Sequence, residues 1–191
     1  MSALLSWLLF VQTSQAAVQC PNLQLVAHQT TPPGAICTEV AESLTLCFVC
    51  DGTQVTPVHL LDWGVTLEQL VAHATTATAP AVNPAHLVRQ EVVDSPGHAY
   101  WLSASQDGLD TAALLHPDAL RALLGGEVVV GIPGQGALIA WVPGDPELDT
   151  MVAVGIATMH AQAARPVSDK VYMHRDGEWV VWGETRRTNP F

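Results

Sequence analysis

Residues 127–144 read EVVVGIPGQGALIAWVPG, and residues 145–163 continue as DPELDTMVAVGIATMHAQA. Two apolar runs separated by a glycine-rich turn predict a hairpin of two buried strands. Asp145 suits a helix N-cap and Pro146 suits the first helical position, so a long helix should follow. A helix with one apolar face needs a sheet to pack on, so this stretch predicts an α+β fold. The apolar positions that share one stripe of that helix are Leu148, Met151, Val152, Gly155, Ile156, Met159 and Ala163.

The flanking segments extend this pattern. Residues 171–183, VYMHRDGEWVVWG, predict a hairpin with an Asp-Gly turn at 176–177. Residues 116–126, HPDALRALLGG, predict a helix that two glycines end, and residues 98–105, HAYWLSAS, predict a strand that turns at 106–108. Successive hairpins imply antiparallel pairing. We therefore expect a two-layer sandwich, with a mostly antiparallel sheet and helices packed on one of its faces.

The N-terminal half is less regular. Residues 44–50, LTLCFVC, alternate like a strand and end at an Asp-Gly turn, so residues 54–61 should form a second arm. Pro57 restricts that arm to a sheet edge. A Thr-x-x-Gln capping box predicts a short helix over 66–75. Prolines and a glycine within TTPPGAIC, residues 30–37, favour a loop.

The first residues predict export. Residues 1–10, MSALLSWLLF, form a short apolar run followed by small and polar residues, which is typical of a signal peptide over 1–17. This places the protein in the periplasm or outside the cell. The positive charge that usually precedes the apolar run is missing, because the first cationic residue is Arg89. A buried N-terminal helix or a misplaced start codon therefore stays open as an alternative.

Cleavage at this site leaves residues 18–191 as a single α+β domain. We divide it into a cysteine-bearing N-terminal segment, 18–60, and a core, 61–191. The run at 1–10 is too short for a transmembrane helix, so no membrane span is expected after cleavage.

Four cysteines, Cys20, Cys37, Cys47 and Cys50, lie in the first third of the chain. An even number in an exported domain predicts two disulfides. Residues three apart on a strand point to opposite faces, so Cys47 and Cys50 should each pair with one of Cys20 and Cys37. A zinc site normally needs two close cysteine pairs, and a redox pair needs a helix N-terminus. Metal-binding and redox-active thiols stay open as weaker alternatives, as does lipidation of Cys20.

The charge excludes several partners. The formal net charge is −11, from 7 Lys and Arg against 18 Asp and Glu. Such an acidic surface repels phosphate backbones and anionic headgroups, so nucleic acids and membrane surfaces are poor ligands.

The order of elements resembles a known family. The segments that carry the likeness are DWGVTLEQLVAHA (62–74), AYWLSASQDGLDTAALL (99–115), GEVVVGIPGQGALIAWVPGD (126–145) and RPVSDKVYMHRDGEWVV (165–181). Over roughly residues 44–183 the chain is similar to the YtpQ-like bacterial family of unknown function. The resemblance implies the α+β fold and supplies no catalytic residue. The export signal and the cysteine-bearing segment are departures from that family.

Two short motifs have ordinary structural explanations. His116-Pro117-Asp118 matches the tripeptide of J-domain co-chaperones, but the two long basic helices of that domain are absent, and helix initiation explains it. GIPGQG, residues 131–136, fits neither a dinucleotide nor a phosphate-loop pattern, so it predicts a turn.

Dispersed polar groups carry the remaining possibilities. His59, His73 and His98 could converge with Asp62 into a catalytic or metal site, although a surface position is commoner for single histidines. Acidic residues at 145–149 could act as a carboxylate pair, but acids in a first turn also favour a helix dipole. Tryptophans on predicted strands should fill the sheet core, or else form an aromatic binding face: Trp101, Trp141, Trp179 and Trp182.

No catalytic, cofactor-binding or metal-ligating residue can be assigned from these patterns, and no cofactor is expected. We predict a non-catalytic binding or assembly domain of the cell envelope, whose partner is a protein or an envelope component. The alternative is a hydrolase with a site assembled from dispersed His and Asp or Glu residues. A metal carrier that uses the cysteines is a third possibility.

Overall fold

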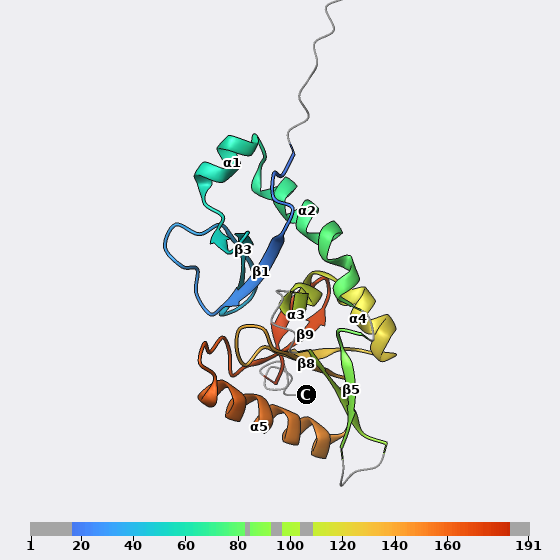
Figure 1. The fold of residues 1–191 in the computed structure, drawn as a ribbon. Helices are drawn as coiled ribbons and strands as arrows, with labels where there is room; N and C mark the ends of the chain where they lie inside the picture. The colour runs from blue at the N-terminus through green and yellow to red at the C-terminus, as the bar shows by residue number, and fades with distance from the viewer. Residues whose placement is uncertain (1–16, 83–84, 93–96, 104–108, 184–191) are drawn as a thin grey trace, which may run out of the picture.

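The computed structural model describes residues 17–82, 85–92, 97–103 and 109–183 (Figure 1). Within these ranges the chain forms five α-helices and two antiparallel sheets, which confirms the predicted α+β class. The signal peptide, except for its last residue, and the turn at 106–108 lie outside the described residues.

The smaller sheet has four strands and lies in the N-terminal part of the chain. β3 forms the middle of the sheet, with β1 on one side and β2 and β4 on the other. The strand predicted at 44–50 is confirmed, as is the loop predicted at 30–37 up to its last residue, where β2 begins. The strands β1 and β2 were not predicted. The strands are β1 (Leu23–His28), β2 (Cys37–Ala41), β3 (Leu44–Cys50) and β4 (Thr53–Gln54).

The prediction of a second strand over 54–61 was wrong beyond its first residue. Pro57 occupies the first turn of a helix, α1 (Pro57–Trp63), and Thr56 is its N-cap. Thr56 and His59 form a capping box, and proline fits a first helical turn because its missing N–H has no intrahelical partner there. Helix initiation therefore explains Pro57 better than an edge strand does.

The larger sheet has six strands in the order β10-β9-β7-β8-β6-β5. The hairpins predicted at 127–144 and 171–183 are confirmed as β7–β8 and β9–β10. The strand β5 was not predicted. The strands are β5 (Val88–Glu91), β6 (Ala99–Ser103), β7 (Val129–Gly131), β8 (Leu138–Trp141), β9 (Val171–Arg175) and β10 (Glu178–Val181).

The predicted helices are present with their predicted caps. Thr66 Oγ1 accepts the Gln69 N–H at 3.2 Å, and the Gln69 side chain accepts the Thr66 N–H at 2.8 Å, which completes the capping box of α2. Asp145 caps α5. The helices after α1 are α2 (Leu67–Thr78), α3 (Leu109–Ala112), α4 (Pro117–Leu124) and α5 (Pro146–Gln162).

The six-stranded sheet is covered on both faces, not on one as expected. Val129 points toward α5 and packs in one apolar cluster with its buried side chains, while Val130 points into the main core with α3 and α4. Figure 1 shows α5, in orange, along the outer face of this sheet. The buried stripe of α5 is narrower than predicted, because Met151 and Met159 are 42% and 40% exposed.

The main core runs from one sheet to the other. Phe48 of the small sheet and Tyr172 of the large one belong to the same buried cluster. The Tyr172 hydroxyl donates to the Glu42 carbonyl at 3.2 Å, and Lys170 Nζ lies 2.6 Å from the Glu42 carboxylate. Apolar packing and polar contacts thus join the β2–β3 turn to β9.

Among the described residues, no helix combines the length and the apolar character needed to cross a bilayer.

Candidate functional site

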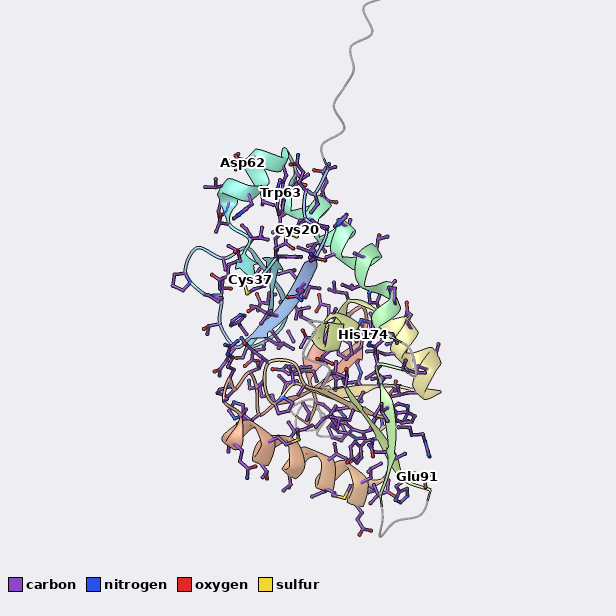
Figure 2. All side chains as sticks on the ribbon, in the orientation of Figure 1. Cys20, Cys37, Asp62, Trp63, Glu91 and His174 are labelled. Carbon is purple, nitrogen blue, oxygen red and sulfur yellow. A yellow bond between two sulfur atoms is a disulfide. The ribbon has the colours of Figure 1, made fainter. Side chains whose placement is uncertain are left out.

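The four cysteines form two disulfides, Cys20–Cys50 and Cys37–Cys47. This confirms that Cys47 and Cys50 pair with the two earlier cysteines and not with each other. Cys37 and Cys47 face each other directly across β2 and β3. Figure 2 shows Cys20 and Cys37 in the N-terminal part of the molecule, far from Glu91. Two disulfides are typical of a protein in an oxidising compartment.

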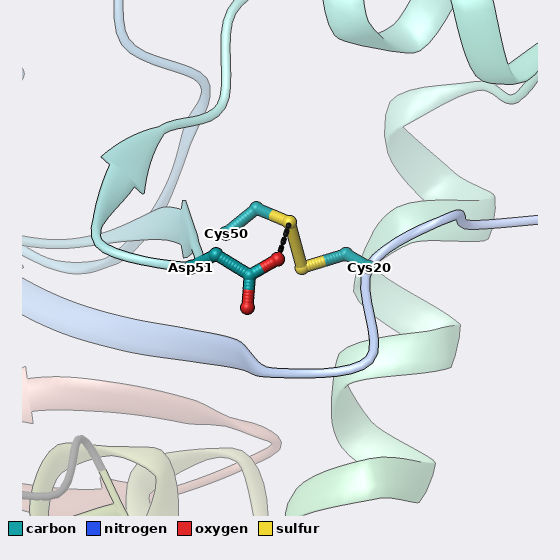
Figure 3. A group of neighbouring side chains, drawn as sticks. All are labelled: Cys20, Cys50 and Asp51. Carbon is teal, nitrogen blue, oxygen red and sulfur yellow. Dashed lines mark hydrogen bonds between the residues drawn. A yellow bond between two sulfur atoms is a disulfide. The ribbon is translucent and has the colours of Figure 1, made fainter.

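Cys20, Cys50 and Asp51 are the one group among the described residues whose ligand atoms gather closely enough for a metal, within 4.8 Å (Figure 3). The two sulfurs are joined, so neither carries the thiolate charge that a metal ligand needs. The Asp51 carboxylate lies 3.7 Å from Cys50 Sγ and accepts a hydrogen bond from Asn22 Nδ2 at 2.7 Å. In its oxidised form this group has a structural role.

The histidines singled out from the sequence do not form a common ligand group in the described residues. His59 Nδ1 accepts the Thr56 N–H at 3.0 Å in the α1 cap. His98 Nε2 lies 2.9 Å from the Asp145 carboxylate, beside the start of α5. His73 is exposed on α2. These three histidines therefore lie in separate parts of the fold.

The acidic residues at 145–149 begin α5. Asp145 accepts the N–H groups of Leu148 at 3.0 Å and Glu147 at 2.8 Å, and these hydrogen bonds, that from Leu148 foremost, lower the pKa of its carboxyl. Asp149 is buried and accepts the Trp141 indole N–H at 2.9 Å. The helix-start interpretation is confirmed for Asp145, whereas Asp149 lies in the first turn of α5 and accepts hydrogen bonds from outside the helix.

The tryptophans belong mainly to the core. Trp141 and Trp179 are buried, and Trp101 and Trp182 are half-buried against the apolar clusters. The exposed large apolar side chains in the described residues are all aliphatic or methionine, so the aromatic binding face is not supported.

The two short motifs also have structural roles. His116 and Pro117 begin α4, as predicted. The 131–136 segment links β7 to β8, and a Cβ on Gly131 would come within 2.9 Å of Ile156 Cγ1 and closer still to Cδ1. Glycine is needed at 131 because α5 packs closely on the strand.

A cleft of about 910 Å³ lies between the small sheet and the end of α5. Its floor is formed by side chains of β1 and by the neighbouring end of β3, and the β7–β8 connection forms a wall. Four glutamines from different elements line it. The lining includes the side chains of Gln24, Val26, His28, Val49, Gln54, Gln135, Gln162 and Arg165.

The charge of this cleft is opposite to that of the chain. None of the described residues that line it is Asp or Glu, and Arg165 is its one permanent charge. The full chain has 18 acidic and 7 basic residues. An anionic group in this cleft would meet a cation with no carboxylate in the lining to compete for it.

Three side chains connect across the cleft through long contacts. The Gln135 amide lies 3.4 Å from both ring nitrogens of His28 and donates to the Ala27 carbonyl at 3.4 Å. Arg165 Nη1 donates to Gln135 Oε1 at 3.4 Å. Hydrogen bonds this long are weak, so a ligand could replace them at low cost.

Burial lowers the pKa of His28 below its ordinary value, so its imidazole is neutral near pH 7. The backbones of the other two residues are joined, because the Gln135 N–H donates to the Arg165 carbonyl at 3.0 Å.

A second groove, of about 610 Å³, lies between β2 and the β9–β10 hairpin. It is acidic, with Glu39, Glu42 and Glu178 among its lining residues. His174 also lines it, and Arg121 Nη2 donates to His174 Nδ1 at 2.8 Å. This groove has the charge that the composition predicts, and the first cleft does not.

The site residues His28, Gln135 and Arg165 were not predicted from the sequence. The one local signal was the rarity of basic residues, which makes Arg165 notable. Comparisons with protein-family models, with curated proteins and with solved structures found no match for this chain. The resemblance to the YtpQ-like family therefore stays a prediction.

Proposed function

We propose that this protein is an exported binding domain without catalytic activity, and that it holds a carboxylate-bearing peptide in the cleft between the small sheet and the end of α5. The export signal predicted at 1–17 and the two disulfides support a periplasmic or extracellular location. The partner would be a protein or a peptide component of the envelope.

The observation that carries the proposal is the charge of the cleft. Arg165 lies in a lining without carboxylates, although the chain has more than twice as many acidic as basic residues. A guanidinium binds a carboxylate through two parallel hydrogen bonds, which gives both affinity and orientation. Arg165 is exposed, and its side-chain hydrogen bond to Gln135 Oε1 is long, at 3.4 Å, so the guanidinium is accessible to a ligand.

The rest of the lining fits a peptide backbone. Each glutamine side chain offers two donors and an acceptor, which matches the alternating C=O and N–H groups of an extended chain. Gln24 comes from β1, Gln54 from β4, Gln135 from the β7–β8 connection and Gln162 from the end of α5. Val26 adds an apolar contact surface for a small side chain.

A hydrolase is the second candidate, because a neutral His28 in a cleft could act as a general base. It ranks second because no nucleophile or carboxylate accompanies His28 in the described lining. The Thr111 hydroxyl already donates to the Leu25 carbonyl at 3.0 Å. Asp110 is buried and accepts a hydrogen bond from the Ser103 hydroxyl.

The test compares two short peptides that differ only at their C-terminus. An acetylated alanine-valine pentapeptide with a free carboxylate should bind more tightly than its C-terminal amide, by about tenfold or more, in isothermal titration calorimetry. Arg165→Gln should remove this difference. Arg175→Gln, on the far end of β9, is the matched control and should keep it.

Equal affinity for the carboxylate and the amide would contradict the proposal. Mass spectrometry of the peptide after incubation separates the two candidates, because cleavage that His28→Gln abolishes would favour the hydrolase.

A further inference from the structure

The strand β5 is an open edge of the six-stranded sheet. Among the described residues it pairs with β6 on one side and ends the sheet on the other, and all four of its residues are exposed. Figure 1 shows β5 at the side of the molecule, away from the small sheet. The opposite edge strand, β10, instead lies against β2. An exposed edge strand is a template for pairing with another strand.

The alternation of hydrogen bonds identifies which backbone groups face outward. The Val92 N–H donates to the His98 carbonyl at 3.0 Å, so Val92 points its backbone groups toward the β6 side. In an antiparallel pair, alternate residues direct their N–H and C=O groups to the same side. Arg89 and Glu91 therefore direct theirs away from β6, toward the open edge.

The sequence of this edge is self-complementary. Residues 88–92 read VRQEV, which is symmetric about Gln90 except that Arg89 is matched by an opposite charge, Glu91. An antiparallel pair of two such strands, with a two-fold axis at Gln90, sets Arg89 opposite Glu91 of the second copy. It also makes these two residues the hydrogen-bonded pair, as their outward backbone groups require.

The side chains agree with this register on both faces. Arg89 and Glu91 share one face, where they lie 2.6 Å apart, and the Arg89 guanidinium lies 5.9 Å from the centre of the Trp101 ring. Two copies would bring four such charges together with alternating sign. Val88 faces the other way, is 48% exposed, and would lie opposite Val92 of the second copy.

We propose that the protein forms a symmetric homodimer through antiparallel pairing of two β5 strands about Gln90. The occupant of the edge is a second copy, because the complementarity lies within one short segment of this chain. Pairing would join two six-stranded sheets into one continuous sheet and leave both clefts open. The proposal does not depend on the ligand of the cleft.

The dimer should be weak, because one short strand forms the contact, and we expect a Kd of about 10–100 µM. Sedimentation velocity of the mature chain across a concentration series measures it. The salt concentration should be about 0.15 M, where the Debye length is about 8 Å, because each copy carries a formal charge of −11.

Charge-reversal variants test the register. Arg89→Glu sets two acidic residues opposite each other, and Glu91→Arg sets two basic residues opposite each other. Each variant alone should weaken the dimer by at least about tenfold, because like charges lie directly opposite. An equimolar mixture of the two should restore association, since every opposed pair in the mixed dimer is again Glu against Arg.

The double variant that carries both changes should also dimerise. Glu178→Arg, which reverses an exposed charge on β10, is the matched control and should leave the Kd unchanged. Circular dichroism and thermal unfolding verify that each variant is folded.

Two results would overturn the proposal. One is a monomeric wild-type chain at every concentration up to about 1 mM. The other is a dimer that Arg89→Glu and Glu91→Arg leave intact, or whose loss the mixture does not repair.

Discussion

The two sheets of this protein are held together by different means. The four-stranded sheet carries both disulfides, and one of its strands, β4, has two residues. The six-stranded sheet contains no cysteine and lies between α5 on one face and the main core on the other. Covalent links hold the first region, and apolar packing on two faces holds the second.

The difference follows from how many faces of each sheet are buried. Leu25 and Phe48 bury one face of the small sheet in the core, whereas Gln24 and Val26 on the other face line the cleft. A sheet that buries one face gains less from apolar packing than a sheet that buries two. Disulfides can supply that missing stability without filling the cleft. The small sheet thus keeps the face that lines the cleft open.

The largest effect should come from removing a disulfide. The Cys20–Cys50 link closes a loop of 30 residues, and replacing both cysteines by alanine should lower the free energy of unfolding by about 3–4 kcal/mol. The Cys37–Cys47 link closes a loop of 10 residues and should cost about 2–3 kcal/mol. Urea unfolding of the two double variants measures both values.

Hydrogen exchange of the variant without the Cys20–Cys50 link then tests the contrast between the sheets. Amides of β1 and β3 should lose protection, while those of β7 and β9 keep it. Equal loss in both sheets would show that they unfold as one unit and that the disulfides do not stabilise the small sheet separately.

A smaller effect should come from Gly131→Ala in the packed sheet. The new Cβ would meet three atoms of the Ile156 side chain, which is fully buried. Overpacking of this kind costs about 1–3 kcal/mol. Thermal or urea unfolding measures the loss, and the cost should be lower in an Ile156→Val background, which lacks the closest methyl group.

Gly155→Ala is the matched control, because its Cβ would meet nothing within 4 Å. It lies inside α5, where alanine is preferred over glycine by about 1 kcal/mol, so it should be neutral or stabilising. A loss of stability at 155 as large as that at 131 would refute the close-packing explanation.

The fold was predictable where structure is local. The hairpins at 127–144 and 171–183 and the capped helix α5 follow from turn residues, caps and apolar spacing. Strands β1 and β2 were missed because their partner, β3, determines them. Leu23 pairs with Cys50, and no nearby turn marks that register. β5 was missed because it is an exposed edge strand with a polar sequence.

The candidate site was less predictable than the fold. The chain separates His28 from Gln135 and Arg165 by more than a hundred residues, and no motif links the three. The backbone bond from the Gln135 N–H to the Arg165 carbonyl and the packing of the β7–β8 connection beside β1 bring them together. Such convergence depends on the three-dimensional arrangement of distant elements.

The smallest predicted effect is a dependence of stability on pH that both regions share. Burial lowers the pKa of His28 in the small sheet, of His174 in β9 of the large sheet and of His116 at the start of α4, below the ordinary value of 6.5. Arg121 lowers the pKa of His174 further, since a guanidinium can only donate to Nδ1 and repels a protonated ring.

Below pH 6.5 the unfolded chain therefore binds more protons at these histidines than the folded chain does. Their contribution to stability is complete above pH 6.5 and is lost as the pH falls through the lower folded pKa values. The urea concentration at the unfolding midpoint should therefore decrease as the pH is lowered from about 7.5 to about 5.5.

Single variants measure how much of this pH dependence comes from the large sheet and how much from the small sheet. His174→Gln keeps an acceptor for Arg121 but does not titrate, so it should reduce the pH dependence more than His28→Gln, whose ring meets no cation of this kind. His73→Gln, on the exposed side of α2, is the control and should leave the dependence unchanged. If His174→Gln kept the full wild-type pH dependence, the Arg121–His174 contact would not be part of its origin.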